Sequence, residues 1–172
     1  GMRIAVIDTG LDLDHPSFDP ASYDYALGQV QGSWDLLDQK EIAQVLPRLT
    51  IAKDGLTAAD LYRNTKVAFG YNYVDGDLDI THDNDPQGDH GTHVAGIATA
   101  NRYIRQGSGF ASAAETVLTC GIAPEAQLLV MKVFGKNGGA YSDDYMAAIQ
   151  DAMYLGCDAI NLSLGSNSPG FV

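Results

Sequence analysis

The sequence predicts an α/β fold built on a parallel β-sheet, and three observations support this fold class. Short apolar runs of strand length lie at residues 3–8, 127–134 and 158–164. A helical pattern separates the last two runs, and such a strand–helix–strand unit joins parallel strands through a right-handed crossover. At 172 residues with 45% hydrophobic residues, the chain has the size of a single domain with one core.

The first run, from Arg3 to Asp8, is nearly continuous in apolar residues and is followed by Thr9 and Gly10. This pattern is typical of a strand that is buried on both faces of a parallel sheet. Asp8 is therefore expected at the carboxyl end of its strand, where open α/β sheets carry their sites.

The stretch that follows reads as an insertion over the core, at about residues 19–87. It holds a helical patch at 36–52, which Pro47 breaks, and a second patch near 57–63. Residues 75–89 are rich in Gly and Asp and are interpreted as a loop.

Helical spacing of small and apolar residues then predicts a helix from His90 to about Arg105, and polar residues 107–114 predict a loop. After the strand at 127–134, a helix should start at Ser142 as its N-cap, with acidic residues in the first turn, and should end at Gly156. The strand at 158–164 completes the unit.

Composition limits the classes of partner. Ten basic and 22 acidic residues give a net charge of −12, which argues against nucleic acid or an anionic membrane and fits calcium or cationic peptides better. No apolar run approaches the roughly 20 residues of a membrane span. The two cysteines, Cys120 and Cys157, either pair or stay reduced; we favour free thiols, because both lie beside apolar runs, and neither has the neighbours of a zinc site.

Two motifs carry catalytic chemistry. Val6-Ile7-Asp8-Thr9-Gly10 is followed by Asp89-His90-Gly91-Thr92-His93-Val94-Ala95-Gly96, and hydrolysis by a hydroxyl nucleophile needs a histidine base that a buried carboxylate orients. Alone, Asp-Thr-Gly is an ordinary turn or half of an aspartic protease site, which needs a second copy that the chain lacks. His90 and His93 could instead be core residues, or a metal pair completed by Asp85 or Asp89.

Together with Gly121-Ile122-Ala123-Pro124 and Ile160-Asn161-Leu162-Ser163-Leu164-Gly165, these motifs resemble the subtilisin-like serine proteases, the subtilases of peptidase family S8. The resemblance covers segments 2–18, 88–104 and 121–168. It implies a three-layer fold in which Asp8 is the buried carboxylate and His90 the general base. It also implies two substrate-binding edges for a polypeptide, which consist of Gly138, Gly139 and Ala140 and of Ser163, Leu164 and Gly165.

The long spacer between Asp8 and His90 looks more like the large cell-envelope proteinases and C5a-peptidase-like members, which implies a secreted or cell-surface protein. Nothing in the 172 residues matches the family's oxyanion Asn or its Gly-Thr-Ser nucleophile, and Ser166 and Ser168 are poor substitutes. We therefore expect one partial peptidase domain, with its core at 2–18 and 88–172 and a sheet that is incomplete on its C-terminal side.

Such a chain should be inactive alone and should associate through its exposed sheet edge. Its alternative function is non-catalytic binding of a peptide or partner. A nucleotide-binding domain is disfavoured, because no Gly-rich phosphate loop follows the first strand.

No cofactor is required for this chemistry, and no metal ligand is predicted. The acidic residues Asp75, Asp77, Asp79, Asp83 and Asp85 have the oxygen ligands that calcium prefers but lack the spacing of an EF-hand, so we interpret them as a solvated face. Subtilases often bind calcium through an acidic residue after a His-Pro pair, whereas here Ser17 follows Pro16, and Asp19 is a displaced alternative. Calcium as a structural ion stays open.

Overall fold

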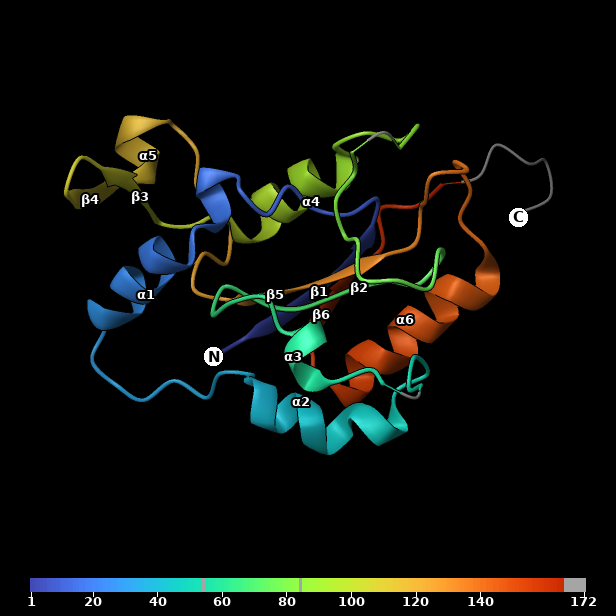
Figure 1. The fold of residues 1–172 in the computed structure, drawn as a ribbon. Coiled ribbons are helices and arrows are strands. Elements are labelled where there is room, and N and C mark those ends of the chain that lie inside the picture. The colour runs from blue at the N-terminus through green and yellow to red at the C-terminus, as the bar shows by residue number, and fades with distance from the viewer. Residues whose placement is uncertain (54, 84, 166–172) are drawn as a thin grey trace.

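A computed structural model describes residues 1–53, 55–83 and 85–165. Four parallel strands form its central sheet in the order β2-β5-β1-β6 (Figure 1). These strands are β1 (Arg3–Asp8), β2 (Val67–Asn72), β5 (Gln127–Lys132) and β6 (Ala159–Asn161). The α/β fold class with a parallel sheet is thus confirmed.

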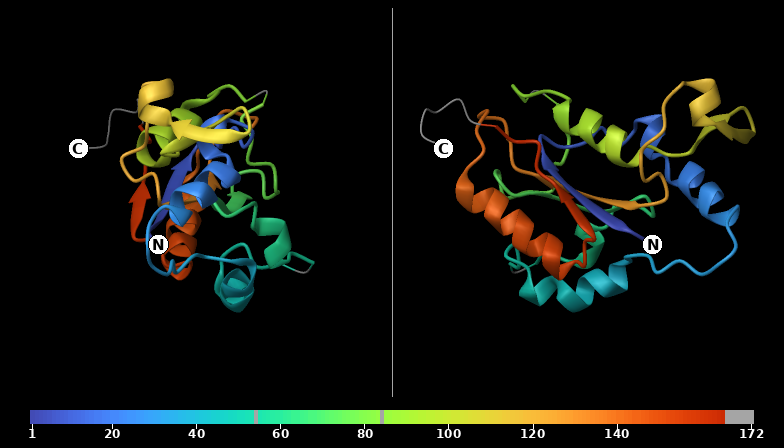
Figure 2. Two further views of the ribbon diagram at one scale, coloured as in Figure 1. Left: turned by 90° about the vertical axis from the view of Figure 1, so that its left-hand side faces the viewer. Right: turned by 180° about the vertical axis from the view of Figure 1, so that it is seen from behind.

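Helices cover both faces of the sheet (Figures 1 and 2). The helices are α1 (Pro20–Gly28), α2 (Gln39–Val45), α3 (Ala58–Leu61), α4 (His90–Thr99), α5 (Ala113–Thr116) and α6 (Ser142–Tyr154), with 3₁₀ turns η1 (Pro16–Phe18) and η2 (Leu46–Arg48). Helix α4 lies on one face, whereas α6, α2 and α3 lie on the other. None of the helices described is long and apolar enough to span a bilayer.

Alternation along β1 divides the core into two clusters. Ala5 and Ile7 are fully buried against the side that carries α6 and the helices of the 36–61 stretch. Val6 packs on the opposite side with Val130 and with Ala95 of α4. The strand is buried over its whole length, as its sequence predicts.

Strand β2 lies within the stretch interpreted as an insertion, and the sequence analysis does not identify it. It pairs with β5, so residues 19–87 supply an edge strand of the sheet as well as helices beneath it. Its six residues are all buried, and their β-branched and aromatic side chains are the signal that could have found it. How the chain divides into core and insertion stays a prediction.

Two predictions between residues 90 and 114 are wrong. Helix α4 ends at Thr99, because Ala100 leaves the helical conformation with ψ at 137°. The expected loop at 107–114 instead holds the turn and second strand of a hairpin, in which β3 (Tyr103–Gln106) pairs antiparallel with β4 (Gly109–Ser112). Gly107 supplies the positive φ of 59° that this tight turn needs.

The other boundaries move by a few residues. Ser142 is the first residue of α6 and Tyr141 its N-cap, while Gly156 follows the helix with a positive φ of 69°, as expected for a helix end. The strands predicted at 127–134 and 158–164 are shorter than expected. Residues 166–172, including Ser166 and Ser168, lie outside the described residues.

Candidate active site

The first strand positions Asp8 at the carboxyl edge of the sheet. There, Oδ1 of Asp8 lies 2.8 Å from Nδ1 of His90, the first residue of α4. The Asp8 side chain is 1% exposed and that of His90 is 53% exposed. The structure therefore brings the predicted carboxylate and base together, with one buried and the other open to a reactant.

The backbone and side chain of Thr9 hold the two motifs in register. The Thr9 amide donates to Asp8 Oδ1 at 2.7 Å, and the Thr9 hydroxyl donates to the Gly88 carbonyl at 3.0 Å. The hydroxyl also accepts from the Gly91 amide at 2.8 Å. Peptide groups on both sides of His90 are thus fixed to the residue that follows Asp8.

Gly91 allows this close approach. A Cβ atom at Gly91 would lie 2.4 Å from the carbonyl oxygen of Gly10 and 3.1 Å from the amide nitrogen of Thr9. No side chain larger than hydrogen fits there without moving the helix. This steric limit explains why a glycine follows His90.

The second histidine of the motif lies apart from this pair. His93 Nε2 is 3.4 Å from Asp89 Oδ2, and both side chains are largely exposed. Within residues 1–53, 55–83 and 85–165, no three His, Cys, Asp or Glu side chains gather in a way that could hold a metal ion. The metal-pair reading of His90 and His93 therefore gains no ligand set from the structure.

The two expected substrate edges follow β5 and β6 at the same end of the sheet (Figure 2). Ala140 from the first edge and Leu164 and Gly165 from the second line one cavity of about 610 Å³. Its other walls are largely apolar and include Phe134, Tyr145 and Leu162. Gly138, Gly139 and Ser163 do not line this cavity, although Gly139 and Ser163 are next in sequence to residues that do.

Gln87 reaches the first edge from the loop that precedes His90. Its side-chain amide donates to the Gly138 carbonyl, so that carbonyl already has a partner. Ser163 donates to the Asn161 side chain at 2.8 Å. Sequence reasoning missed Gln87, because nothing in its local pattern marks a contact across 51 residues.

The acidic loop divides between exposed and buried carboxylates. Asp77 and Asp79 are exposed and accept backbone amides two residues ahead, at 3.0 Å each, as solvated turn residues do. The Asp85 side chain is nearly buried instead and pairs with Lys132 at the end of β5. The solvated-face interpretation is therefore wrong for Asp85.

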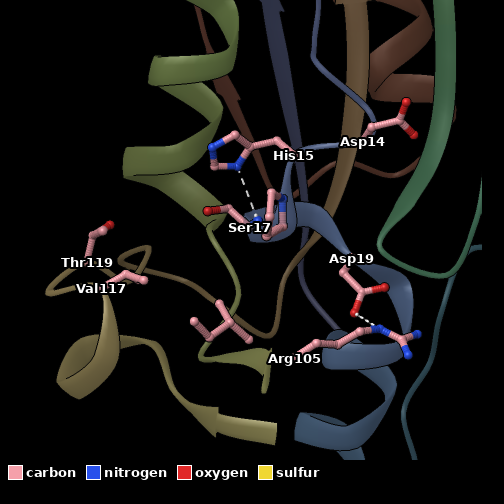
Figure 3. A pocket seen from close by; sticks show the side chains of 9 residues that line it. Asp14, His15, Ser17, Asp19, Arg105, Val117 and Thr119 are labelled. Carbon is pink, nitrogen blue, oxygen red and sulfur yellow. Dashed lines mark hydrogen bonds and ion pairs between the residues drawn. The ribbon is translucent and has the colours of Figure 1, made fainter. Parts of the chain in front are cut away.

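A separate cavity of about 680 Å³ lies between η1 and the segment 104–119 (Figure 3). His15 Nδ1 there accepts the Ser17 amide at 3.2 Å, and Asp19 pairs with Arg105 at 2.9 Å. Burial alone would raise the pKa of Asp19, but hydrogen bonds from Ser22 and Arg105 lower it below its ordinary value. Protein donors thus already contact the Asp19 carboxylate, which the sequence suggests as an alternative calcium ligand.

Both cysteines are free thiols. Burial raises the pKa of Cys157 to about 12, so this thiol stays protonated at neutral pH and behaves as a small apolar side chain.

Comparison with known proteins bears directly on this site. The family model described as "Subtilase family" matches residues 1–171. The chain is 37% identical to a PI-type proteinase of Lactococcus lactis subsp. cremoris, over 98% of this chain and 8% of that protein. It is 33% identical to a C5a peptidase of Streptococcus pyogenes, over 96% and 12%.

A further relative is the minor extracellular protease Vpr of Bacillus subtilis, which is 29% identical over 97% of this chain and 14% of that protein. The chain thus spans about a tenth of the length of the relatives it matches.

Proposed function

This chain belongs to the subtilase family, and from that premise we propose that it forms the amino-terminal part of the catalytic domain of a serine-type endopeptidase. At family level the protein is a serine protease and hence a hydrolase. The observation that carries the finer proposal is the 2.8 Å contact between buried Asp8 and half-exposed His90. A polypeptide is its proposed substrate.

The pair divides the work of proton transfer. Asp8 holds the Nδ1 side of the imidazole, which leaves Nε2 of His90 to accept the proton of a serine hydroxyl as that oxygen attacks the peptide carbonyl. The buried carboxylate stabilises the imidazolium, which then gives the proton to the leaving amine. We propose that the serine and the oxyanion donor come from polypeptide outside these 172 residues.

The cavity between the two edges supports binding of an extended peptide. Such a peptide adds main-chain hydrogen bonds to exposed strand edges, and its side chains enter pockets beside them. The largely apolar lining around Ala140 and Leu164 suits an apolar substrate side chain. Glycines at positions 138, 139 and 165 leave room for the peptide backbone.

Alanine variants of the two neighbouring histidines, His90 and His93, provide the test and its control. In a longer form of the protein that carries the nucleophile, His90→Ala should lower hydrolysis of a chromogenic peptide by several orders of magnitude. His93→Ala should leave it within a few-fold, because His93 lies outside the pair with Asp8. The 172-residue chain should show no turnover; turnover that His90→Ala abolishes would contradict its proposed dependence on an external serine.

A second candidate is a non-catalytic peptide-binding module, and the cavity shared by the two edges is what favours it. Calorimetry with extended peptides distinguishes the two functions. Gly139→Pro should abolish binding by preventing main-chain pairing, whereas Asn137→Ala in the exposed turn just before it should not. Peptide binding in a full-length protein without hydrolysis would select the module.

We also propose that the protein acts outside the cytoplasm, since the Bacillus relative is named an extracellular protease.

The outer edge of β6 has no partner strand among the described residues, and Leu162 beside it is exposed. Unpaired strand edges favour association. Sedimentation of the 172-residue chain should reveal oligomers, and a sharp monomer boundary would contradict this expectation.

A further inference from the structure

Lys132 carries a buried positive charge at the centre of the site region. It ends β5, where it is paired in register with Asp8 of β1 and Asn72 of β2. The residue is 1% exposed. A buried ammonium is costly unless charge and hydrogen bonds compensate it, so its partners show what the charge does.

The ammonium has two partners, one next to Asp8 in the chain and one in the loop that precedes His90. It donates to the carbonyl oxygen of Thr9 at 2.7 Å, and it forms an ion pair with Asp85. Asp85 is also nearly buried, with 8% of its side chain exposed. The pair is therefore shielded from solvent and from salt.

The first partner controls the position of Asp8. The backbone of Thr9 is held at both of its polar groups, because its amide donates to the Asp8 carboxylate and its carbonyl accepts from Lys132. In addition, the Val133 amide donates to the Asp8 carbonyl at 2.9 Å. The residue after β5 and the side chain at its end thus fix two successive carbonyl groups, those of Asp8 and Thr9.

The second partner controls the approach to His90. Asp85 opens a turn in which its carbonyl accepts the Gly88 amide at 3.1 Å, and the Gly88 carbonyl in turn accepts the Thr9 hydroxyl. This turn leads directly into α4. One ammonium therefore fastens the turn that leaves β1 to the turn that enters α4.

We propose that Lys132 is a positioning residue for the Asp8–His90 pair, acting through its buried ion pair with Asp85. The ion pair sets the relative placement of two turns, and that placement gives the His90 imidazole one orientation against the carboxylate. The catalytic meaning of this inference rests on the proposed protease function, but the orientation itself is measurable without catalysis.

The experiment records ring-nitrogen NMR spectra of histidine-labelled protein for the 172-residue chain. In the parent, His90 should be predominantly the Nδ1–H tautomer, since Asp8 accepts from that nitrogen. Asp85→Asn and Lys132→Met should shift His90 toward the mixed tautomers of solvent-exposed His93. Lys132→Arg, which keeps the charge, should restore most of the parent spectrum.

A second buried lysine supplies the matched control. Lys66 is also fully buried, and its Nζ donates to the carbonyls of Pro124 and Ala126 beyond the opposite, amino end of the sheet. Lys66→Met should change stability but leave the His90 spectrum as in the parent. If Lys132 has a merely structural role, Lys132→Met and Asp85→Asn should likewise change stability and leave the His90 spectrum unchanged. An unchanged His90 spectrum in folded samples of both variants would overturn the proposal.

Asp8→Asn distinguishes failure of the Asp8–His90 pair from failure of the role proposed for the Lys132–Asp85 ion pair. If it leaves the His90 tautomer unchanged, the proposed catalytic pair itself fails. If Asp8→Asn alters the tautomer while Asp85→Asn does not, the pair stands and the role of the ion pair is rejected. In a form that carries the serine, Asp85→Asn should lower kcat by roughly 10- to 100-fold with KM little changed, as expected for misplacement of a base.

Discussion

The amide of Gly91 donates a 2.8 Å hydrogen bond to the hydroxyl of Thr9, which joins the two motifs of the candidate active site directly. The contact is buried and links residues that are 82 positions apart in the chain. The spacing of Asp8 and His90 is therefore set by main-chain and hydroxyl groups as well as by their own side chains.

Removal of the Thr9 hydroxyl should loosen this junction. Thr9→Val keeps the shape but leaves the Gly91 amide and the Gly88 carbonyl without their partner, which should cost about 1–3 kcal/mol of unfolding free energy. Thr9→Ser retains the hydroxyl and should cost much less. Urea unfolding followed by Trp34 fluorescence measures both, and equal stability of the Val and Ser variants would show that the hydroxyl is dispensable.

The two glycines of α4 should respond oppositely to alanine. At Gly91 a methyl group meets the Gly10 carbonyl, so Gly91→Ala should destabilise the fold by about 1–3 kcal/mol, as overpacking does. At Gly96 a Cβ meets nothing within 4 Å, so Gly96→Ala should stabilise the helix by roughly 0.5–1 kcal/mol. Thermal unfolding of both variants tests this; a stable Gly91→Ala protein would contradict the close approach.

Lys66 should make stability depend on pH. Burial lowers its pKa from 10.5 to about 7, against the opposing effects of Glu125 and Cys120, and its Nζ lies 4.9 Å from the centre of the Tyr23 ring. Between those two values the unfolded chain binds more protons than the folded one. Stability should therefore rise with pH through this window, while below about 7 the penalty is constant.

The measurement compares the parent with Lys66→Met, so that other titrating groups cancel. Unfolding free energies from pH 6 to 9 should show the parent gaining on the variant above neutrality. A constant difference across that range would show that Lys66 does not titrate there.

Asp151 should be a strong anchor between α6 and the 36–61 stretch. Its fully buried carboxylate accepts the Thr50 amide at 2.7 Å, the Thr50 hydroxyl at 2.8 Å and the Tyr73 hydroxyl at 3.0 Å. Asp151→Ala leaves these three donors without an acceptor and should lower the unfolding free energy by about 2–4 kcal/mol. Exposed Gln150 is the control, and Gln150→Ala should stay within about 0.5 kcal/mol in the same denaturation assay.

The sequence predicts what depends on local pattern and motif. The buried run at 3–8 predicts β1 correctly, and the order of the Asp and His motifs predicts the pair that the structure brings to 2.8 Å. Boundaries are less certain, because the end of α4 is set by how the next segment packs and not by helical propensity.

Contacts between distant residues could not be predicted. Asp85 reads as one carboxylate among several in a polar loop, and only the fold places it against Lys132. The pairing of β2 with β5 belongs here too, because the composition of residues 67–72 favours a strand but does not reveal its partner. A single sequence carries the local signal but not the pairing.

The order of strands in the sheet has a consequence for how the chain folds. Strand β1 is synthesised first but lies inside the sheet, where Arg3 pairs with Gln127, more than a hundred residues later. Pairings this distant in sequence close slowly, because the loop entropy is lost before the contacts form. In a growing chain, we therefore expect Asp8 to reach its place beside Lys132 only after β5 has left the ribosome.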